Sequence, residues 1–399
     1  MATIEIRLRA ANSIGDVSAE AWDACANPQS GPGNGAQSCA SRLSYNPFIS
    51  HDFLSALEQS GSVRSRTGWQ PMHLLAEDAS GTLLGAVPCY AKSHSQGEYV
   101  FDHGWADAYE RAGGNYYPKL QVSVPFTPAT GRRLLVRPGP EADAVRAALA
   151  DALADICQRS NASSVHVTFM PKDEWDLLGA RGYLQRTHRQ FHWENAGYES
   201  FDAFLAALAS RKRKTIRRER AHALENGISV HWLTGSDLTE SVWDAFFDFY
   251  METGSRKWGR PYLTRAFYSI VGETMRDRIL LVMAKRNGRW IAGALNFIGS
   301  DTLFGRHWGA TEHHPFLHFE LCYYQAIDYA IRHKLARVEA GAQGQHKITR
   351  GYLPTTTYSA HYIVDPALRR AVADFLKHER MHIAAEVEEL AEAAPFRKG

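Results

Sequence analysis

Hydrophobic and polar positions in the first half of the chain follow a strand period at first and a helical period later. Residues 72–77 and 83–91 are rich in β-forming residues and flank a glycine-containing turn, so they predict a hairpin. Residues 99–105 continue as a third predicted strand. Apolar residues then recur at helical spacing over 141–158, and 164–170 is an apolar run typical of a buried strand. The predicted order is hairpin, strand, helix, strand.

The second half of the chain repeats this order. Residues 279–285 and 290–298 flank an Asn-Gly turn, and 302–309 follows as a third strand. A helical pattern over 316–333 leads into a short apolar run at 336–340. A Gly-Ala pair also lies at matching places in the second strand of each hairpin. We therefore interpret the chain as a duplication of one α/β unit.

The pattern also predicts where the two copies join. The chain has 399 residues, which exceeds the size at which one hydrophobic core usually stops growing, so two domains are expected. An Asn-Ala-Gly stretch near Asn195 interrupts both patterns, and a new amphipathic helix follows Ser200, a residue type favoured at helix N-caps. We expect domains at 1–195 and 196–399, and a long amphipathic helix over 366–394.

Composition narrows the cellular setting. Apolar residues make up 45% and charged residues 22% of the chain, the net charge is +2, and no apolar run approaches the roughly 20 residues that span a bilayer. Five cysteines are scattered without a C-x-x-C pair, which favours reduced thiols and excludes a cysteine zinc site. The first residues lack the apolar stretch of a secretory signal. We expect a cytoplasmic protein without membrane insertion.

One segment concentrates positive charge. Residues 211–222 contain seven Arg or Lys and one Glu. One interpretation is a solvated helix face. The other is an anion site formed by Arg213, Lys214, Arg217 and Arg218, which would suit the phosphates of coenzyme A, the acceptor end of a tRNA or a pyrophosphate-linked cell-wall precursor.

Several segments resemble the FemAB-like predicted N-acyltransferases, a family labelled peptidoglycan biosynthesis/recognition. The resemblance extends over about 46–362. It is carried by Asn-Pro-Phe at 46–48, the stretches 51–58, 101–106, 116–121 and 124–128, the helix at 201–220 and the segment 336–354. It implies tandem duplicated GNAT-type (acyl-CoA N-acyltransferase-like) α/β domains with mixed central sheets. It also implies transfer of an acyl or aminoacyl group from acyl-CoA or aminoacyl-tRNA to a small-molecule or peptide amine, such as that of a peptidoglycan-type precursor.

Acyl transfer of this kind requires a positioned donor, a base for the attacking amine and a donor of hydrogen bonds to the oxyanion. The chain has no G-x-S-x-G motif and no cysteine spaced with a histidine, so direct transfer is favoured over an acyl-enzyme. Residues 310–316 do not match the glycine-rich loop that holds coenzyme A in typical GNAT domains. Acyl-CoA and aminoacyl-tRNA therefore both remain candidate co-substrates, and no tightly bound cofactor is expected.

Candidate site residues follow from position and from the resemblance. Glu339 ends a short strand before a glycine-rich turn, where active-site carboxylates often lie, although a salt bridge with Arg337 or Lys347 would also explain it. The candidate catalytic residues are Glu339, His307 and Tyr352. Candidate substrate-binding residues from the long loop 102–126 are Asp102, Trp105, Tyr117, Lys119 and Gln121, and those from the second half are Arg306, His346, Lys347 and Arg350.

The histidines of the second half also suggest a metal site. His314 and His318 have the i, i+4 spacing of helical ligands, but Pro315 disfavours a helix that continues back through His314. We expect no metal. A catalytically inert cell-wall or peptide recognition protein is the main alternative function, and a metal-dependent hydrolase is a distant third.

Overall fold

The chain folds into two compact units in the computed structural model, which describes residues 5–28, 44–258, 261–341 and 344–397. Unit 1 comprises Met1–His188 and Thr357–Ala384, and unit 2 comprises Arg189–Thr356 and Ala385–Gly399. The chain thus returns to unit 1 near its end, which the expected division at 195/196 does not include. No helix in the described part of the chain combines the length and apolarity needed to cross a membrane.

Unit 1 contains two groups of strands. The first is an antiparallel sheet in the order β1 (Arg7–Ala11), β3 (His73–Glu77), β4 (Leu83–Val87) and β7 (Leu135–Val136). The second runs from β8 (Ser164–Met170) through β6 (Lys119–Val122) and β5 (Cys89–Lys92) to β2 (Trp69–Pro71), with β6 and β8 parallel. The helices are α1 (Ala19–Ala26), α2 (His51–Gln59), α3 (His103–Arg111), α4 (Ala142–Arg159) and α5 (Lys172–Ala180).

The structure confirms most predicted elements of this unit and corrects one. The β3–β4 hairpin, α4 and β8 lie where the pattern places them. The predicted strand at 99–105 is wrong, because Tyr99 has a positive φ and α3 begins at His103. Trp105 and Ala106 are the buried residues of α3. The apolar residue at the end of the predicted strand, Trp105, therefore belongs to the buried side of an amphipathic helix.

Unit 2 is built on antiparallel strands in the order β10 (Ser229–Leu233), β11 (Ile279–Arg286), β12 (Arg289–Ile298) and β13 (Thr302–Ala310). Strand β14 (Arg337–Glu339) pairs in parallel with β13 and antiparallel with the end of β9 (Leu184–Glu194). The predicted strands of the second half are confirmed. The helices are α6 (Phe201–Ala207), α7 (Ser210–Ala223), α8 (Glu240–Trp258), α9 (Arg265–Thr274), α10 (Leu317–Phe319), π-helix η6 (Glu320–Tyr324) and α11 (Gln325–Arg332).

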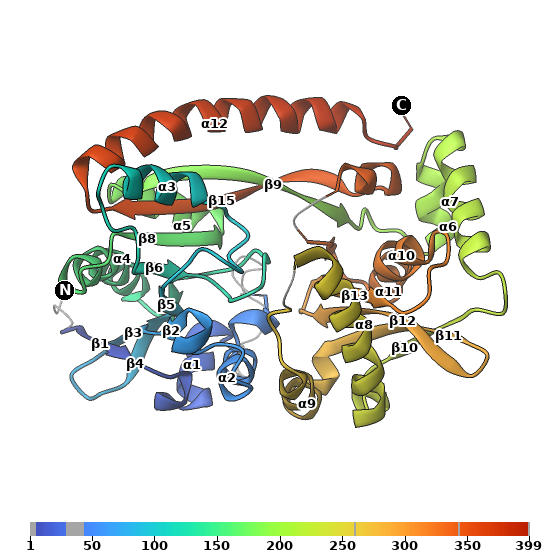
Figure 1. Ribbon diagram of the computed structural model, residues 1–399, viewed down its shortest axis with the longest axis horizontal. Helices are drawn as coiled ribbons and strands as arrows, with labels where there is room; N and C mark the ends of the chain where they lie inside the picture. Colours follow the sequence, from blue (N-terminus) through green and yellow to red (C-terminus); the bar gives the residue numbers. More distant parts are fainter. Residues whose placement is uncertain (1–4, 29–43, 259–260, 342–343, 398–399) are drawn as a thin grey trace. The chain divides into compact units, whose positions relative to one another are not determined.

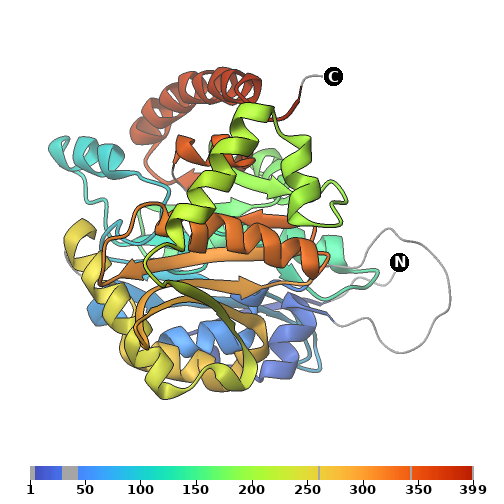
Figure 2. The same ribbon diagram turned by 90° about the vertical axis from the view of Figure 1, so that its right-hand side faces the viewer.

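Helices cover both faces of the unit 2 sheet. Helix α11 and η6 share a hydrophobic core with β11 and β12, whereas α8 packs on the other face of β12 and β13 (Figure 2). The packing of α8 is close: a Cβ atom added to Gly309 would lie 2.0 Å from the backbone oxygen of Phe249. Glycine at this position therefore allows α8 to approach β13.

Strands β13 and β14 separate after a short stretch of parallel pairing. The last paired residues are Phe304 and Glu339, and β13 continues from Gly305 to Ala310 without β14 beside it. A β-bulge lies at the point of separation, since Leu295 of β12 pairs with His307 and Asn296 pairs with Gly305, so that Arg306 is the extra residue. Bulges often redirect side chains next to active sites.

The remaining long elements have residues in both units. Strand β15 (Leu353–Ile363) pairs with β8 through Tyr358–Ile363. The predicted C-terminal helix is confirmed as α12 (Pro366–Glu392). Residues 27–44 are rich in Gly, Pro, Ser and Asn, a composition that predicts an exposed loop, and 29–43 of this segment lie outside the described residues.

Candidate functional site

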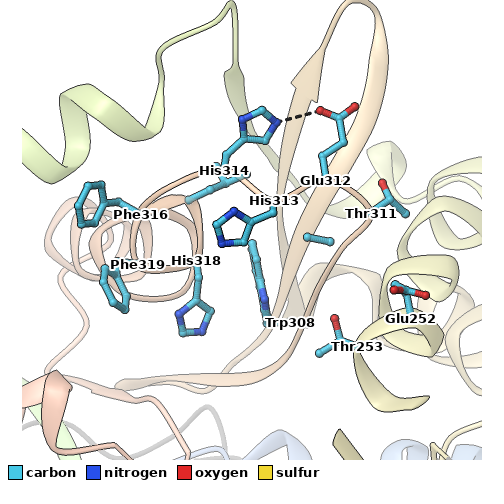
Figure 3. A pocket seen from close by; sticks show the side chains of 12 residues that line it. Glu252, Thr253, Trp308, Thr311, Glu312, His313, His314, Phe316, His318 and Phe319 are labelled. Carbon is cyan, nitrogen blue, oxygen red and sulfur yellow. Dashed lines mark hydrogen bonds and ion pairs between the residues drawn. The ribbon is translucent and has the colours of Figure 1, made fainter. Parts of the chain in front are cut away.

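A pocket of about 530 Å³ lies in unit 2, where β13 ends and the next helix begins. Its walls come from the end of β13, the connection to α10, α10 itself and two residues of α8 (Figure 3). The lining residues are Glu252, Thr253, Trp308, Ala310, Thr311, Glu312, His313, His314, Phe316, Leu317, His318 and Phe319. The junction of a strand with a following helix is a common ligand position in α/β units.

Aromatic rings form one wall of this pocket. Trp308 and His318 meet edge to face with ring centroids 5.2 Å apart, and Phe319 lies 5.6 Å from His318. Phe316 has a left-handed backbone, with φ of 65°, directly before α10. A bulky residue in this conformation carries backbone strain, a feature that clusters at functional sites.

The opposite wall is polar. Glu312 accepts a hydrogen bond of 2.8 Å from His314 and forms an ion pair with Arg286 at 3.1 Å. The bond from His314 lowers the pKa of Glu312, with Arg286 as a further cause. Throughout the described residues, no three His, Cys, Asp or Glu side chains come together as a metal site. The hydrogen bond from His314 to Glu312 holds the His314 ring in place along the loop.

A second cavity, of about 100 Å³, lies where β13 separates from β14. It shares Trp308 and His318 with the larger pocket. The other lining residues are Ala294, Leu295, Asn296, Gly305, Arg306, His307, Cys322, Tyr323 and Ala340. Two of the sequence candidates, Arg306 and His307, are thus brought to one cavity.

His307 is a neutral imidazole in this setting. Burial, and then the charge of Arg306, hold the pKa of His307 well below its usual value. Its Nδ1 atom is buried, and none of the described side chains or backbone groups forms a hydrogen bond with it. A neutral imidazole with an available nitrogen can accept a proton.

Tyr323 lines the small cavity from η6. Its hydroxyl shares a hydrogen bond of 3.0 Å with Nε2 of His346. Burial, followed by the charges of Arg350 and Lys347, lowers the pKa of His346, whereas burial raises the pKa of Tyr323. The pair therefore joins a protonated hydroxyl to a neutral imidazole at neutral pH. Isolated π-turns of this kind are frequent at functional sites.

Buried ion pairs fix η6 against α7. The carboxylate of Glu320, which is 0% exposed, accepts hydrogen bonds from Arg220 at 2.9 to 3.2 Å and from Gln325 at 2.6 Å. One helical position earlier on α7, Glu219 accepts two bonds from Arg350 at 2.8 and 3.0 Å. These pairs restrain the helix that carries Tyr323.

Arg350 and Lys347, both substrate-binding candidates, are buried. The guanidinium of Arg350 donates to Glu219 and lies 3.5 Å above the ring of Phe319. The ammonium of Lys347 donates to the carbonyl oxygens of Ala340 at 2.7 Å and Gly341 at 3.0 Å. Burial lowers the pKa of Lys347 to about 8. Both cations thus support the wall of the site from behind.

Glu339 and Tyr352 lie behind the cavities. Glu339 is 4% exposed, and one of its carboxylate oxygens is 4.0 Å from Nε2 of His192. Tyr352 is fully buried and donates to the backbone oxygen of Tyr323 at 3.3 Å. Neither residue lines the two cavities, whereas Ala340 lines the smaller one. Their catalytic roles stay predictions.

The basic run forms α7, which lies next to α6 in Figure 1. Near the C-terminal end of α7, the ring of His222 lies 5.5 Å from the ring of Phe316, which lines the larger pocket. Arg217 forms an exposed ion pair of 3.0 Å with Asp202. Arg213, Lys214 and Arg218 form no ion pair with any described residue. Part of the run is therefore structural, and the rest is available to an anion.

The candidates from unit 1 are gathered in a buried network. Lys119, which is 0% exposed, donates to Glu98 at 2.7 Å, Asp102 at 2.5 Å and Ser95 at 2.8 Å. Burial alone would lower the pKa of Lys119, but the carboxylates of Glu98 and Asp102 more than offset it and raise this pKa. Tyr117 shares a hydrogen bond with Ser95 at 2.9 Å.

The other two candidates lie beside this network. Gln121 is buried and donates to Thr168 at 3.1 Å. The guanidinium of Arg186 lies 4.9 Å above the ring of Trp105. The charged groups of the network neutralise one another inside the unit, so a role in substrate binding stays a prediction.

Sequence reasoning missed several residues of the unit 2 site, namely Asn296, Trp308, Phe316, Phe319, Cys322 and Tyr323. In the sequence, the aromatic residues among these are typical of core positions in a strand and a helix. The position of residues 310–316 could have indicated the pocket, because they connect a predicted strand to a predicted helix. They lack the glycine-rich motif that usually marks such a site. Asn296 carried no signal, since a single polar residue in an apolar strand has no distinctive spacing.

The chain matches one protein family and is similar to several solved structures. A family described as FemAB-like, peptidoglycan biosynthesis/recognition, matches residues 13–398. A search of curated protein sequences finds no match. Among solved structures, L-PGS from Bacillus licheniformis is similar at a TM-score of 0.50 and 9% identity, covering 84% of this chain and 98% of that one.

Two further solved structures are similar at lower TM-scores. FemX has a TM-score of 0.49 and 11% identity over 79% of this chain and 93% of its own. A tandem GNAT protein from the clavulanic acid biosynthesis pathway has a TM-score of 0.47 and 12% identity over 91% of this chain and 99% of its own. The expected α/β class with mixed sheets is confirmed by the strands and helices of both units, and the fold is similar to that of L-PGS.

Proposed function

The chain belongs to the FemAB-like family and is an acyltransferase, and from this premise we propose that it transfers an acyl or aminoacyl group from coenzyme A or tRNA to an amine of a peptidoglycan-type precursor. The observation that carries the proposal is the pair of adjoining cavities in unit 2. One lies at the separation of β13 from β14 and the other at the start of the following helix.

The two cavities suit the two parts of an activated donor. The larger pocket has aromatic rings for a flat or apolar carrier group and a polar loop beside them. The smaller cavity opens beside β13 from Gly305 onward, beyond the last residue that pairs with β14. Unpaired backbone groups at a strand edge can hydrogen-bond an extended amide chain or the carbonyl of an acyl group.

The proposed reaction is direct transfer. The amine nitrogen attacks the acyl carbon, the new C–N bond forms, and the bond from the acyl carbon to the thiol sulfur or ribose oxygen of the donor breaks. Neutral His307 accepts the proton that the amine loses. Tyr323 donates its proton to the departing group. His307 then releases the amine proton to solvent, and Tyr323 takes up a proton from solvent. The hydrogen bond with His346 orients the hydroxyl. Lys347 and Arg350 keep this wall in position.

The free cations of α7 support a donor that carries phosphate. Arg213, Lys214 and Arg218 lie on the helix whose end reaches Phe316 at the rim of the larger pocket. Clustered cations without internal partners favour a multivalent anion. Coenzyme A and the acceptor end of tRNA both carry several phosphates. In tRNA the phosphates extend over a much longer distance than in coenzyme A.

The transfer assay uses two donors, acetyl-CoA and alanyl-tRNA, with a muropeptide that bears a free amine. We expect one donor to give an amide product detected by mass spectrometry, and Tyr323→Phe to slow the transfer. Binding of the muropeptide without transfer from either donor would favour the inert recognition protein and contradict the proposal.

Salt dependence distinguishes the donors. Each phosphate contact to a single strand contributes about 0.7 to the slope of log affinity against log salt. If tRNA is the donor, Arg213→Ala with Arg218→Ala should lower this slope by about 1.4. A matched double variant, Arg370→Ala with Lys377→Ala, removes two cations from α12 and should leave the slope unchanged. Equal slopes in both variants would exclude α7 as the phosphate site.

A further inference from the structure

The small cavity of unit 2 has a size and a polarity that constrain the group it can hold. Its volume is about 100 Å³. An apolar cavity of about 150 Å³ in another protein holds benzene, with six non-hydrogen atoms. By this comparison about four such atoms fill the cavity. Ala294, Gly305 and Ala340 line it, so small residues create its space and larger ones would remove it.

Asn296 introduces a polar group into this cavity. The residue is 1% exposed, and its Nδ2 donates to the backbone oxygens of Leu280 and Ala294, each at 3.3 Å. These two bonds fix the orientation of the amide, so that Oδ1 points the other way. A Cβ added to Gly305, which also lines the cavity, would lie 3.4 Å from Oδ1.

The amide oxygen of Asn296 has no donor of its own. No hydrogen bond to Oδ1 comes from the described part of the chain, so the oxygen is open to the cavity, where water or a bound group can donate to it. An occupant of the cavity displaces that water. Leaving it without a donor is unfavourable, so the cavity favours an occupant that brings an N–H or O–H group. A single methyl or methylene group would leave the oxygen unsatisfied.

The charge around the cavity limits that donor further. Its lining includes Arg306, His307 and His318 but no carboxylate. The lining therefore offers no carboxylate to a cationic group, and burying a cation without a counter-charge is unfavourable. A neutral hydroxyl or a neutral amine avoids this penalty and still satisfies Asn296.

We propose that the small cavity is the acyl-group pocket, and that Asn296 selects a short acyl group, of about four non-hydrogen atoms, that bears a neutral hydrogen-bond donor. This inference rests on the proposed acyltransferase function and adds the specificity of its donor site. Asn296 sets the polarity of the selected group, while Gly305 and its neighbours set the size.

The test compares glycolyl and propionyl groups on one carrier, coenzyme A or tRNA, because these groups have the same number of non-hydrogen atoms and differ by a hydroxyl in place of a methyl. Wild type should prefer glycolyl by at least about tenfold in kcat/KM. Asn296→Leu should abolish or reverse the preference. Octanoyl should be transferred at least about tenfold less well than acetyl.

A second variant covers the case in which Asn296→Leu does not fold. Gly305→Ala meets no atom closer than 3.4 Å and reduces the cavity, so it should lower propionyl transfer severalfold more than acetyl transfer. Gly104→Ala adds the same methyl where nothing lies within 4 Å and should change neither rate.

The outcomes separate the two proposals. Transfer with equal rates for glycolyl and propionyl would overturn the role of Asn296 and indicate that water satisfies its oxygen, while leaving the acyltransferase function intact. Equal transfer of octanoyl and acetyl would overturn the size limit. Absence of transfer from every donor would overturn the proposed function, and this inference with it.

Discussion

Two arginines of α7 form ion pairs of different burial, and their substitution gives a quantitative prediction. Arg220 pairs with Glu320, whose side chain is 0% exposed, whereas Arg217 pairs with Asp202 across exposed surfaces of 59% and 80%. Removing one partner of a buried pair costs about 3–5 kcal/mol, and an exposed pair contributes at most about 1 kcal/mol. Because Arg220 is 23% exposed and Gln325 still donates to Glu320, we expect Arg220→Ala to cost about 3 kcal/mol.

The assay is urea unfolding followed by tryptophan fluorescence. With a slope of about 1–3 kcal/mol per molar urea, Arg220→Ala should lower the midpoint by about 1–3 M. At the same slope, Arg217→Ala should shift the midpoint by at most about a third as much. Adding Glu320→Gln to Arg220→Ala should recover part of the loss, since the two residues are coupled. Equal midpoints for the two single variants would refute the assignment of Arg220 to the interior.

Three further predictions address the same unit. Gly309→Ala should destabilise the fold strongly in thermal unfolding, because the new methyl meets the backbone of Phe249 at 2.0 Å, and Gly305→Ala should leave Tm nearly unchanged; the reverse order would contradict the packing of α8. The folded pKa of Lys347 lies near 8, below its usual 10.5, so the unfolded chain binds more protons between these values and stability should rise with pH from about 8 toward 10. In Lys347→Met this rise should be smaller, and identical pH profiles would contradict the burial of the ammonium. Tyr323→Phe should lower kcat by about 100-fold or more with little change in the donor KM, and a change confined to KM would rule out proton donation.

The regular elements were predictable because their periodicity is local. The strands β11, β12 and β13 alternate or run apolar over 8 to 10 residues, and an Asn-Gly turn fixes their hairpin. The strand predicted at 99–105 was wrong because contacts far along the chain determine the structure of this segment. Its residues satisfy long-range bonds, such as that between Asp102 and Tyr116, and no local pattern reports such partners.

The candidate site was predictable only in part. Arg306 and His307 lie on the strand predicted at 302–309, which the structure contains as β13. Neighbouring positions of one strand lie close together, and both residues line the smaller cavity. The partners of the basic run were not predictable, because Glu320 and Arg350 are more than 90 residues away along the chain. The run that looked uniform in sequence is divided by tertiary contacts into structural and free cations.

The division at 195/196 stays a prediction, which the interruption of the pattern near Asn195 suggested. The interruption at Asn195 follows β9, and the units as folded include a return of Thr357–Ala384 to unit 1. A long strand and a long helix at the C-terminus have residues in both units, and periodicity identifies such elements without showing which core they join.

Hydrogen–deuterium exchange with and without a donor tests the central claim most directly. The claim is that the donor lies along β13 beyond its pairing with β14, and in the pocket that follows. In the presence of acetyl-CoA or alanyl-tRNA, whichever supports transfer, amides of 305–319 should exchange more slowly, with Trp308→Ala weakening the effect. Protection confined to unit 1, with 305–319 unchanged, would contradict the account.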